Sequence, residues 1–260
     1  LDLYYYYTIL FISFEGKNMI SLEFINSERI NFNKYTHYDI PIINNVFYER
    51  LIDTDAKVNY TDLVNNSISI YLSPKVDSYA IKYQQSVLWH EFTHISDFYR
   101  YKLLFPTLIN DILKSYSETH AEILQLRYLL DFSLHQTISK EKRTIFFQNK
   151  EIDLSTYATD MGNKSIHCAF SFIQSKTPQD FDAFMNYYFY FLGYIILHEK
   201  EHAFKLIKYV ISKYPQQLHI DLYNLFISIF SDNAENSAII YQKMFKQAVL
   251  SEVTSFLKFQ

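Results

Sequence analysis

One short segment restricts the structure of this chain more than any other: residues 87–97 read Val-Leu-Trp-His-Glu-Phe-Thr-His-Ile-Ser-Asp. On an α-helix, His90 and His94 lie one above the other on the same face, so both imidazoles can reach one metal ion. Glu91 lies one residue further round and can touch a water molecule bound to that metal. Apolar residues continue with helical spacing on the other side of the segment, which predicts that this side packs against a core.

The choice of a third ligand separates the types of zinc enzyme, because catalytic zinc usually takes three protein ligands and leaves a position for water. Asp97 and Arg100 stand where the metzincin pattern needs Gly and then His or Asp, and this excludes that type. Further along, Glu118 and Glu122 are four residues apart and therefore share one helical face. Both carboxylates are candidates for the third ligand.

The string Glu-Thr-His-Ala-Glu over residues 118–122, following His-Glu-x-x-His, resembles the gluzincin pattern of zinc metallopeptidases. The resemblance implies a zincin-like catalytic domain in which His90, His94 and Glu118 bind Zn²⁺ and Glu91 is the general base. Glu122 would be an acid that holds a ligand histidine in one tautomer, and an exchange of roles between Glu118 and Glu122 stays open. The segment is similar to lethal-factor-like catalytic domains and also to peptidases of the ImmA/IrrE type.

The activity implied by this resemblance is hydrolysis of peptide bonds in a peptide or protein substrate by a metal-activated water. Tyr157 and His167 are candidates for holding the oxyanion, in a segment expected to lie between helical regions. Two alternatives are a zincin-fold binding or regulatory module without turnover and a helical scaffold without metal. An intact Glu91 argues against the inactive module, because that residue is needed for chemistry and not for folding.

A second copy of the motif lies at His198-Glu199-Lys200-Glu201-His202. Its middle positions are charged, and such runs are typical of a solvated helix face. We therefore expect His198 and His202 to belong to a structural helix that binds no catalytic metal.

Composition narrows the class of protein further. A net charge of −4 offers no basic surface for nucleic acid. The single cysteine, Cys168, excludes an intramolecular disulfide and is compatible with a reducing compartment. The apolar run 4–13 is too short to span a bilayer and lacks the features of a signal peptide, so we expect a cytoplasmic protein with no membrane segment. Only 3 Gly and 5 Pro predict a helix-rich fold with short turns.

The predicted class is α+β, with a zincin-like domain at 19–135 and a mainly helical region at 136–260. Residues 1–18 are interpreted as a leader or non-native start ahead of Met19, with a short buried strand as the alternative. In the first domain we expect a hairpin over 20–32, a helix from Pro41 to about Asp53, and a strand at 67–73. That strand is expected at a sheet edge, where extended substrate can pair with it. Helices at 78–101 and 109–130 carry the motif residues.

The second region is predicted to be mainly helical and irregular, without a clear repeat. Thr177-Pro178-Gln179-Asp180 has the features of a helix start, and the aromatic run 181–197 should be largely buried. Further helices are expected at about 199–213, 217–230 and 236–258.

Overall fold

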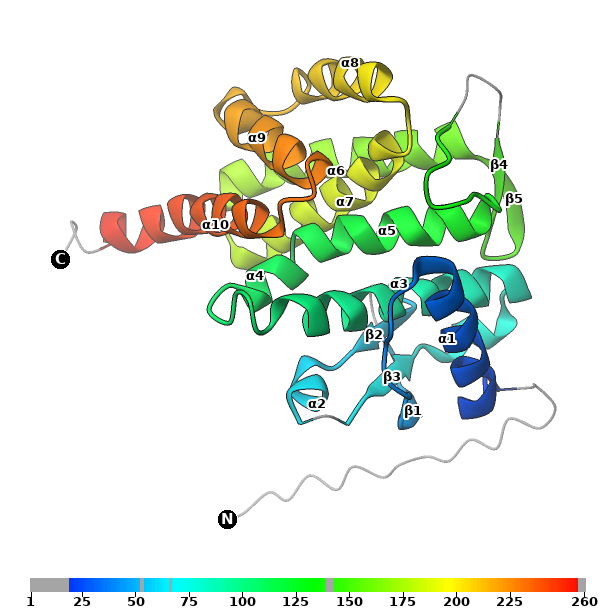
Figure 1. Ribbon diagram of the computed structural model, residues 1–260. Helices are drawn as coiled ribbons and strands as arrows, with labels where there is room; N and C mark the ends of the chain where they lie inside the picture. Colours follow the sequence, from blue (N-terminus) through cyan, green and yellow to red (C-terminus); the bar gives the residue numbers. More distant parts are fainter. Residues whose placement is uncertain (1–18, 52–53, 66, 139–142, 257–260) are drawn as a thin grey trace, which may run out of the picture.

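The computed structural model describes residues 19–51, 54–65, 67–138 and 143–256, so the interpretation of 1–18 lies outside the described residues. Most of the described residues are helical, and the described strands form a three-stranded sheet and a two-stranded hairpin (Figure 1). This mixture of helices and small sheets confirms the predicted α+β class. None of the helices in the described ranges combines the length and the apolar character that a membrane crossing requires.

The three-stranded sheet is mixed. Its strands are β1 (Asn45–Tyr48), β2 (Ala56–Val58) and β3 (Ser69–Leu72), in the order β1-β3-β2. β1 runs parallel to β3, and β2 runs antiparallel to it. The prediction of a strand at 67–73 is confirmed, but its expected place at the edge is wrong. β3 is hydrogen-bonded on both sides and is mostly buried, so β1 and β2 form the edges.

The predicted hairpin over 20–32 is wrong, because this segment is the helix α1 (Leu22–Thr36). The hydroxyl of Ser21 accepts a hydrogen bond from the backbone N–H of Phe24 at 3.1 Å and so caps the first turn. Ile25 and Phe32, seven residues apart, are both fully buried. Two buried residues seven positions apart lie on one face of a helix, and this spacing describes the segment better than the short alternation of apolar residues from which the hairpin was predicted.

The helix expected between Pro41 and Asp53 is also wrong. β1 occupies the middle of that segment and pairs with β3 from Asn45 onwards, and hydrogen bonds just before the two strands extend this pairing by one residue. The Asn44 N–H donates to the Ile68 carbonyl at 2.8 Å, and the Ile68 N–H donates to Asn44 Oδ1 at 2.8 Å. A partner strand distant in sequence thus decides the conformation here, as is common for short strands.

The motif helix is α3 (Ile81–Tyr101), close to the predicted 78–101. The helix predicted at 109–130 is divided into α4 (Ile109–Leu113) and α5 (Tyr116–Leu129). The interruption falls at Ser115, whose φ of −129° and ψ of −84° are not helical. α5 packs along α3 on one side and against α7 on the other.

The remaining chain begins with a hairpin and continues as helices. Its predicted mainly helical character is confirmed, but the hairpin and the long helix that directly follows it were not predicted. Its elements are β4 (Thr144–Phe147), β5 (Lys150–Asp153), α6 (Leu154–Ser175), α7 (Pro178–Ile196), α8 (Lys200–Ile211), α9 (His219–Phe230) and α10 (Ala234–Phe256). Thr177 caps α7 as predicted, since its hydroxyl accepts from the Asp180 N–H at 3.2 Å. The aromatic side chains of α7 form much of the core around α6 and α10.

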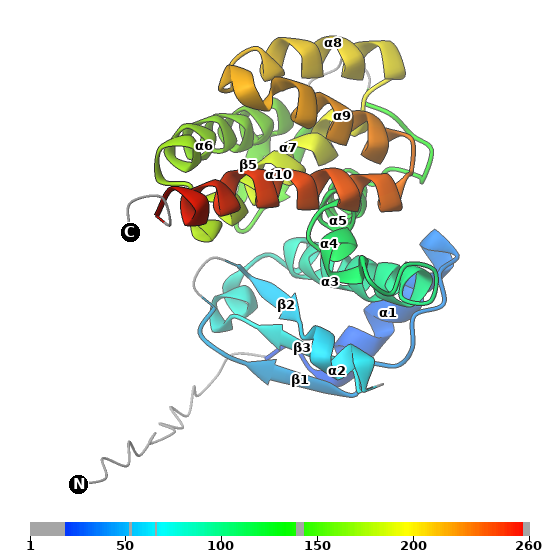
Figure 2. The same cartoon turned by 90° about the vertical axis from the view of Figure 1, so that its left-hand side faces the viewer.

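Viewed from the side, the elements form layers (Figure 2). The three-stranded sheet, α1 and the short helix α2 (Tyr60–Val64) lie on one side of α3. α5 follows on the other side, and α6 to α10 lie beyond it. α5 and α7 come from the two sides of the predicted boundary at residue 135, and they pack against each other.

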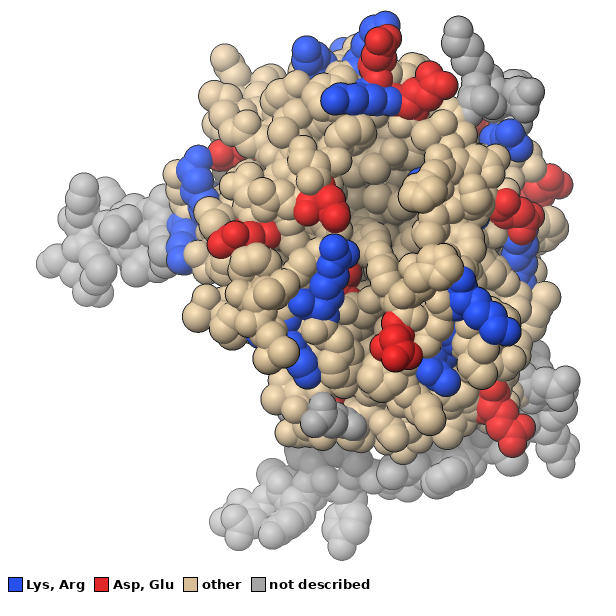
Figure 3. Space-filling model, in the orientation of Figure 1, with Lys and Arg blue, Asp and Glu red and all other residues tan. Residues whose placement is uncertain are grey.

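Charged side chains on the molecular surface are mixed in sign. On the face drawn in Figure 3, basic and acidic side chains lie scattered among uncharged ones, and the surface is hollowed near its centre. Over the described residues, exposed ion pairs include Lys82–Asp131 at 2.6 Å and Lys164–Asp160 at 2.7 Å. This face therefore carries no large area of a single charge.

Candidate metal centre

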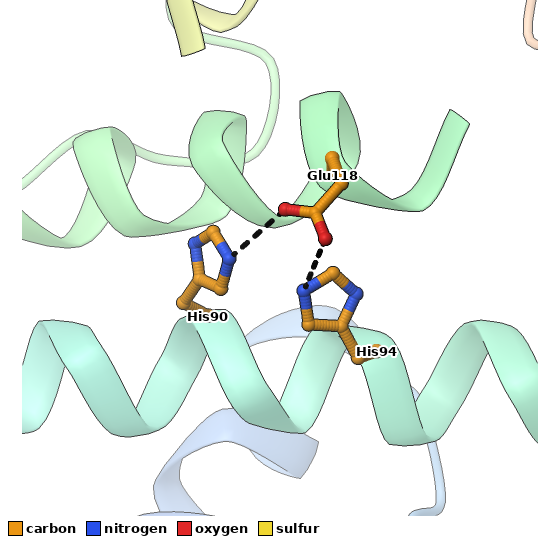
Figure 4. A group of neighbouring side chains, drawn as sticks. All are labelled: His90, His94 and Glu118. Carbon is orange, nitrogen blue, oxygen red and sulfur yellow. Dashed lines mark ion pairs between the residues drawn. The ribbon is translucent and has the colours of Figure 1, made fainter. Parts of the chain in front are cut away.

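His90 and His94 lie on the side of α3 that faces α5, and Glu118 reaches towards them from the first turn of α5 (Figure 4). The Nε2 atom of His90 lies 3.7 Å from Glu118 Oε2, and that of His94 lies 3.7 Å from Glu118 Oε1. One donor atom from each of the three residues lies within 4.8 Å of the others. The three side chains predicted as ligands are therefore brought together at one point.

The second nitrogen of each histidine is held by a neutral group of α5. Nδ1 of His90 lies 3.0 Å from Gln125 Oε1, and Nδ1 of His94 lies 2.9 Å from the Ser117 hydroxyl. Because an amide oxygen only accepts, His90 Nδ1 donates to Gln125, and Nε2 is the nitrogen that faces Glu118. Sequence reasoning missed both partners, although Gln125 is two helical turns beyond Glu118 and thus on the same face.

Glu122 was expected to contact a ligand histidine, and the structure gives it another partner. Its Oε1 accepts a hydrogen bond from the hydroxyl of Tyr157 at 2.8 Å, and Gln125 takes the place beside His90. Glu122 is one turn beyond Glu118, but it is not part of the group of converging donors. Among the described residues the carboxylate that completes the cluster is therefore Glu118.

Burial and neighbouring charges set the ionisation of the cluster. Burial lowers the pKa of His90, but the polar contact with Glu118 and the charges of nearby carboxylates outweigh this and raise the pKa to about 9. In His94 burial dominates and lowers the pKa to about 4. Burial acts to raise the pKa of Glu118, yet the two histidines hold that pKa below its ordinary value. An ionised carboxylate thus faces one neutral imidazole and one that holds a proton, and a metal ion would compete with that proton.

Glu91 lies beside this cluster and faces the sheet. It is only 5% exposed, and its carboxylate has a hydrogen bond with the backbone of Val58 in β2. Burial raises the pKa of Glu91 to about 7. A carboxyl group with this pKa can accept and release a proton near neutral pH.

A cavity of about 220 Å³ opens next to His90 and Glu91, and we call it the His90 cavity. Thr54, Asp55 and Ala56, at the start of β2, form part of its wall. Lys75 also lines it and is 45% exposed, whereas Glu122 is 3% exposed. The cavity therefore extends from the surface near Lys75 to a buried end at Glu122.

The two candidates for holding an oxyanion differ in position. Both lie inside α6 and not in a segment between helices. Tyr157 lines the His90 cavity but donates its hydroxyl to Glu122. His167 is exposed on α6 and is absent from the cavity wall. Tyr190 of α7, which sequence reasoning missed, lines the cavity with its ring centroid 6.1 Å from that of His90.

The second motif copy does not form one helical face. His198 follows the end of α7, Glu199 is the N-cap of α8, and His202 is exposed in the first turn of α8. The ring of His198 is bonded instead to the Tyr194 carbonyl, with Nδ1 at 3.1 Å. The expectation that both histidines share a structural helix is therefore wrong, and within the described residues they are not part of any metal-binding group.

The donors of the cluster fit a zinc ion. Two imidazole nitrogens and one carboxylate oxygen are among the ligand sets of catalytic zinc, and bonds of about 2.0–2.2 Å at tetrahedral angles separate the donors by roughly 3.4 Å. The separations of 3.7 Å between Nε2 and carboxylate oxygen are close to this value. The side chains of His90, His94 and Glu118 are 12%, 6% and 21% exposed, so the cluster is largely but not completely enclosed.

Comparison of the chain with models of protein families, with curated proteins and with solved structures found no match.

Proposed function

We propose that this chain is a zinc-dependent peptidase that hydrolyses peptide bonds, with His90, His94 and Glu118 as metal ligands and Glu91 as general base. One observation carries the proposal: the nitrogen and oxygen donors of the three ligands converge, and Glu91 is buried directly beside them. A donor cluster of this type with an adjacent carboxyl group of raised pKa is what hydrolysis by a metal-activated water requires.

Zinc, when bound, would lower the pKa of a bound water towards about 7 and polarise the scissile carbonyl. Glu91 accepts the proton of the attacking water and delivers it to the leaving amine. Its hydrogen bond with the backbone of Val58 holds the carboxylate in place for both transfers. Gln125 and Ser117 keep the two imidazoles in orientation through their Nδ1 atoms.

Tyr190 is the best-placed donor for a developing oxyanion. Burial and the charges of Glu118, Glu122 and Glu91 raise its pKa well above the ordinary value, so the hydroxyl keeps its proton. Within the described ranges this hydroxyl has no hydrogen-bond partner, whereas that of Tyr157 is engaged by Glu122. A free, protonated phenol next to the metal ligands is suited to stabilise negative charge on a substrate oxygen.

The edge strand β2 takes over the substrate-binding role first expected for residues 67–73. β3 has neighbours on both sides, but β2 is at an edge, and the residues at its start line the His90 cavity. An extended peptide can add to such an edge through main-chain hydrogen bonds. Peptides and unfolded protein segments are therefore the proposed substrates.

The test combines metal analysis with hydrolysis of an unstructured protein such as casein. The wild-type protein should bind one zinc ion and cleave the substrate. Glu91→Gln should keep the zinc and lose about 10²–10⁴-fold in rate, because only proton transfer is removed. His94→Gln should lose zinc, whereas His198→Gln/His202→Gln is the matched control that keeps it.

Each failure has a separate meaning. A wild-type protein that binds zinc but never cleaves would support a binding module without turnover. A protein that binds no zinc would support the helical scaffold. Equal hydrolysis by wild type and Glu91→Gln would remove Glu91 from the mechanism.

A further inference from the structure

The buried end of the His90 cavity contains a carboxylate that is only half satisfied. Glu122 Oε1 accepts from the Tyr157 hydroxyl at 2.8 Å, and the described residues supply no hydrogen bond to Oε2. Glu122 lines the cavity, and it is 3% exposed. Oε2 is not sealed off by protein atoms, so it can accept from a donor that enters the cavity.

Acidic groups outnumber free basic groups around the cavity. Its wall contains the carboxylates of Asp55, Glu91 and Glu122. The basic groups in the wall are Lys75 and His90, and both face carboxylates: Lys75 Nζ lies 3.0 Å from Asp55 Oδ1, and His90 faces Glu118. Burial raises the pKa of Glu122 to about 7 against the opposing effect of His90, and a cation that enters the cavity would favour the ionised carboxylate.

Aromatic rings form much of the remaining wall. They belong to Tyr83, Phe147, Tyr157, Tyr187 and Tyr190. Aromatic rings around a carboxylate attract ammonium and guanidinium groups, because the ring faces carry partial negative charge. At about 220 Å³ the cavity is smaller than the roughly 300–1,000 Å³ that encloses a drug-sized ligand, so it suits a single residue of a substrate.

We propose that the His90 cavity binds a cationic nitrogen group of the substrate and that Glu122, held by Tyr157, is its charge partner. The group is either the side chain of a Lys or Arg residue beside the scissile bond or the α-ammonium of the substrate's amino terminus. This proposal rests on the proposed peptidase function and specifies its substrate class. The buried end of the cavity lies next to His90 and Glu91, so a residue bound there stands beside the reacting bond.

The first experiment measures cleavage of matched peptides by the zinc-loaded protein. Peptides that contain Lys, Arg or the uncharged, similarly shaped norleucine at one position are compared, each with a free and with an acetylated amino terminus. We expect at least about ten-fold preference for the cationic form, as hydrogen bonds to charged groups allow. Faster cleavage of the Lys and Arg peptides than of the norleucine peptide, whether or not the amino terminus is acetylated, would assign the site to a side chain. Slower cleavage on acetylation, whichever side chain is present, would assign the site to the amino terminus.

The matched variant is Glu122→Gln, whose amide oxygen can still accept from Tyr157 while its charge is gone. Its preference for cationic over norleucine peptides should fall about ten-fold or more, and circular dichroism checks that it folds. An unchanged preference in the folded variant would overturn the proposal. If the variant does not fold, the wild-type comparison of charged and uncharged peptides decides alone.

A second experiment does not depend on turnover. The wild-type protein is titrated with n-butylammonium, which mimics a lysine side chain, with leucinol, which carries an α-amino group, and with neutral 1-butanol, and binding is followed by NMR. Tighter binding of at least one amine than of 1-butanol, lost in Glu122→Gln, supports the cavity assignment even if no peptide is cleaved. Cleavage without preference, together with equal binding of amine and alcohol, rejects the assignment and leaves the peptidase proposal standing.

Discussion

Asp97 and His120 form a buried ion pair that joins the two helices of the candidate metal centre. Both carboxylate oxygens of Asp97 contact His120 Nδ1, at 3.0 and 3.1 Å, and the Asp97 side chain is 1% exposed. Asp97 is three residues beyond His94 on α3, and His120 is two residues beyond Glu118 on α5. The pair therefore sets the distance between the helices immediately next to the ligands.

The first prediction concerns this pair. Asp97→Leu should lower the free energy of unfolding by about 3 kcal/mol, because it leaves His120 without its partner in a buried place. The double variant Asp97→Leu/His120→Leu should be less destabilised than the single variant, since the buried imidazole that lost its carboxylate partner is then also removed. Urea unfolding of the three proteins measures this. A double variant that is less stable than Asp97→Leu would contradict the prediction.

The second prediction concerns the groups that orient the histidines. Gln125→Leu and Ser117→Ala should each weaken zinc binding by about 10–100-fold, because the imidazoles lose the hydrogen bonds that fix their orientation. Competition with a coloured chelator measures the affinity. Gln85→Leu is the matched control, because Gln85 is a glutamine of the motif helix itself whose amide donates to Glu28 of α1 at 2.8 Å. Equal affinities of all variants and wild type would show that the two partners do not support the site.

The third prediction uses the two described glycines. A β-carbon at Gly193 would lie 2.5 Å from Glu122 Cγ and 2.8 Å from its Cβ, so α7 and α5 could not keep their distance. Gly193→Ala should cost about 1–3 kcal/mol of stability by overpacking. Gly162→Ala meets the ring of Phe191 at 3.3 Å, a contact that a small ring movement relieves, and it gains up to about 1 kcal/mol of helix propensity. Thermal unfolding should therefore show Gly193→Ala as clearly the less stable variant.

The fourth prediction concerns pH. Burial lowers the pKa of His198 below its ordinary value of 6.5, with His202 acting in the same direction. The unfolded chain then takes up the proton more readily than the folded one, so stability falls as pH drops below about 6.5, and the loss levels off below the folded pKa. Above about 6.5 both states are neutral at this residue and it contributes no pH dependence.

His198→Gln should therefore lose less stability than wild type between pH 7.5 and pH 5.5. Urea unfolding at the two pH values measures the difference, and His167→Gln, at an exposed histidine that does not act on His198, is the control. An identical loss in wild type and His198→Gln would show that protonation of His198 is not linked to folding.

Local signals in the sequence were sufficient for some elements. Thr177 and Pro178 predicted the start of α7, and the confirmed helix 81–101 follows from apolar spacing around the motif. Local sequence signals gave wrong predictions where a segment distant in the sequence decides the conformation. Asn44 and Ile68 pair across the sheet and turn a predicted helix into β1, and no pattern within residues 41–53 reports that partner.

In the candidate site, too, some features follow from the sequence and others depend on the tertiary structure. The spacing of His90, Glu91 and His94 follows from the sequence alone, because the pitch of a helix determines which residues share a face. The resemblance favoured Glu118 as the third ligand but left an exchange with Glu122 open, and the packing of α5 against α3 and α7 places Glu118 in the cluster. Gln125, Tyr157 and Tyr190 likewise reach the site through tertiary packing. A sequence determines helical faces through local geometry, but contacts between helices depend on how all the side chains fill the space between them.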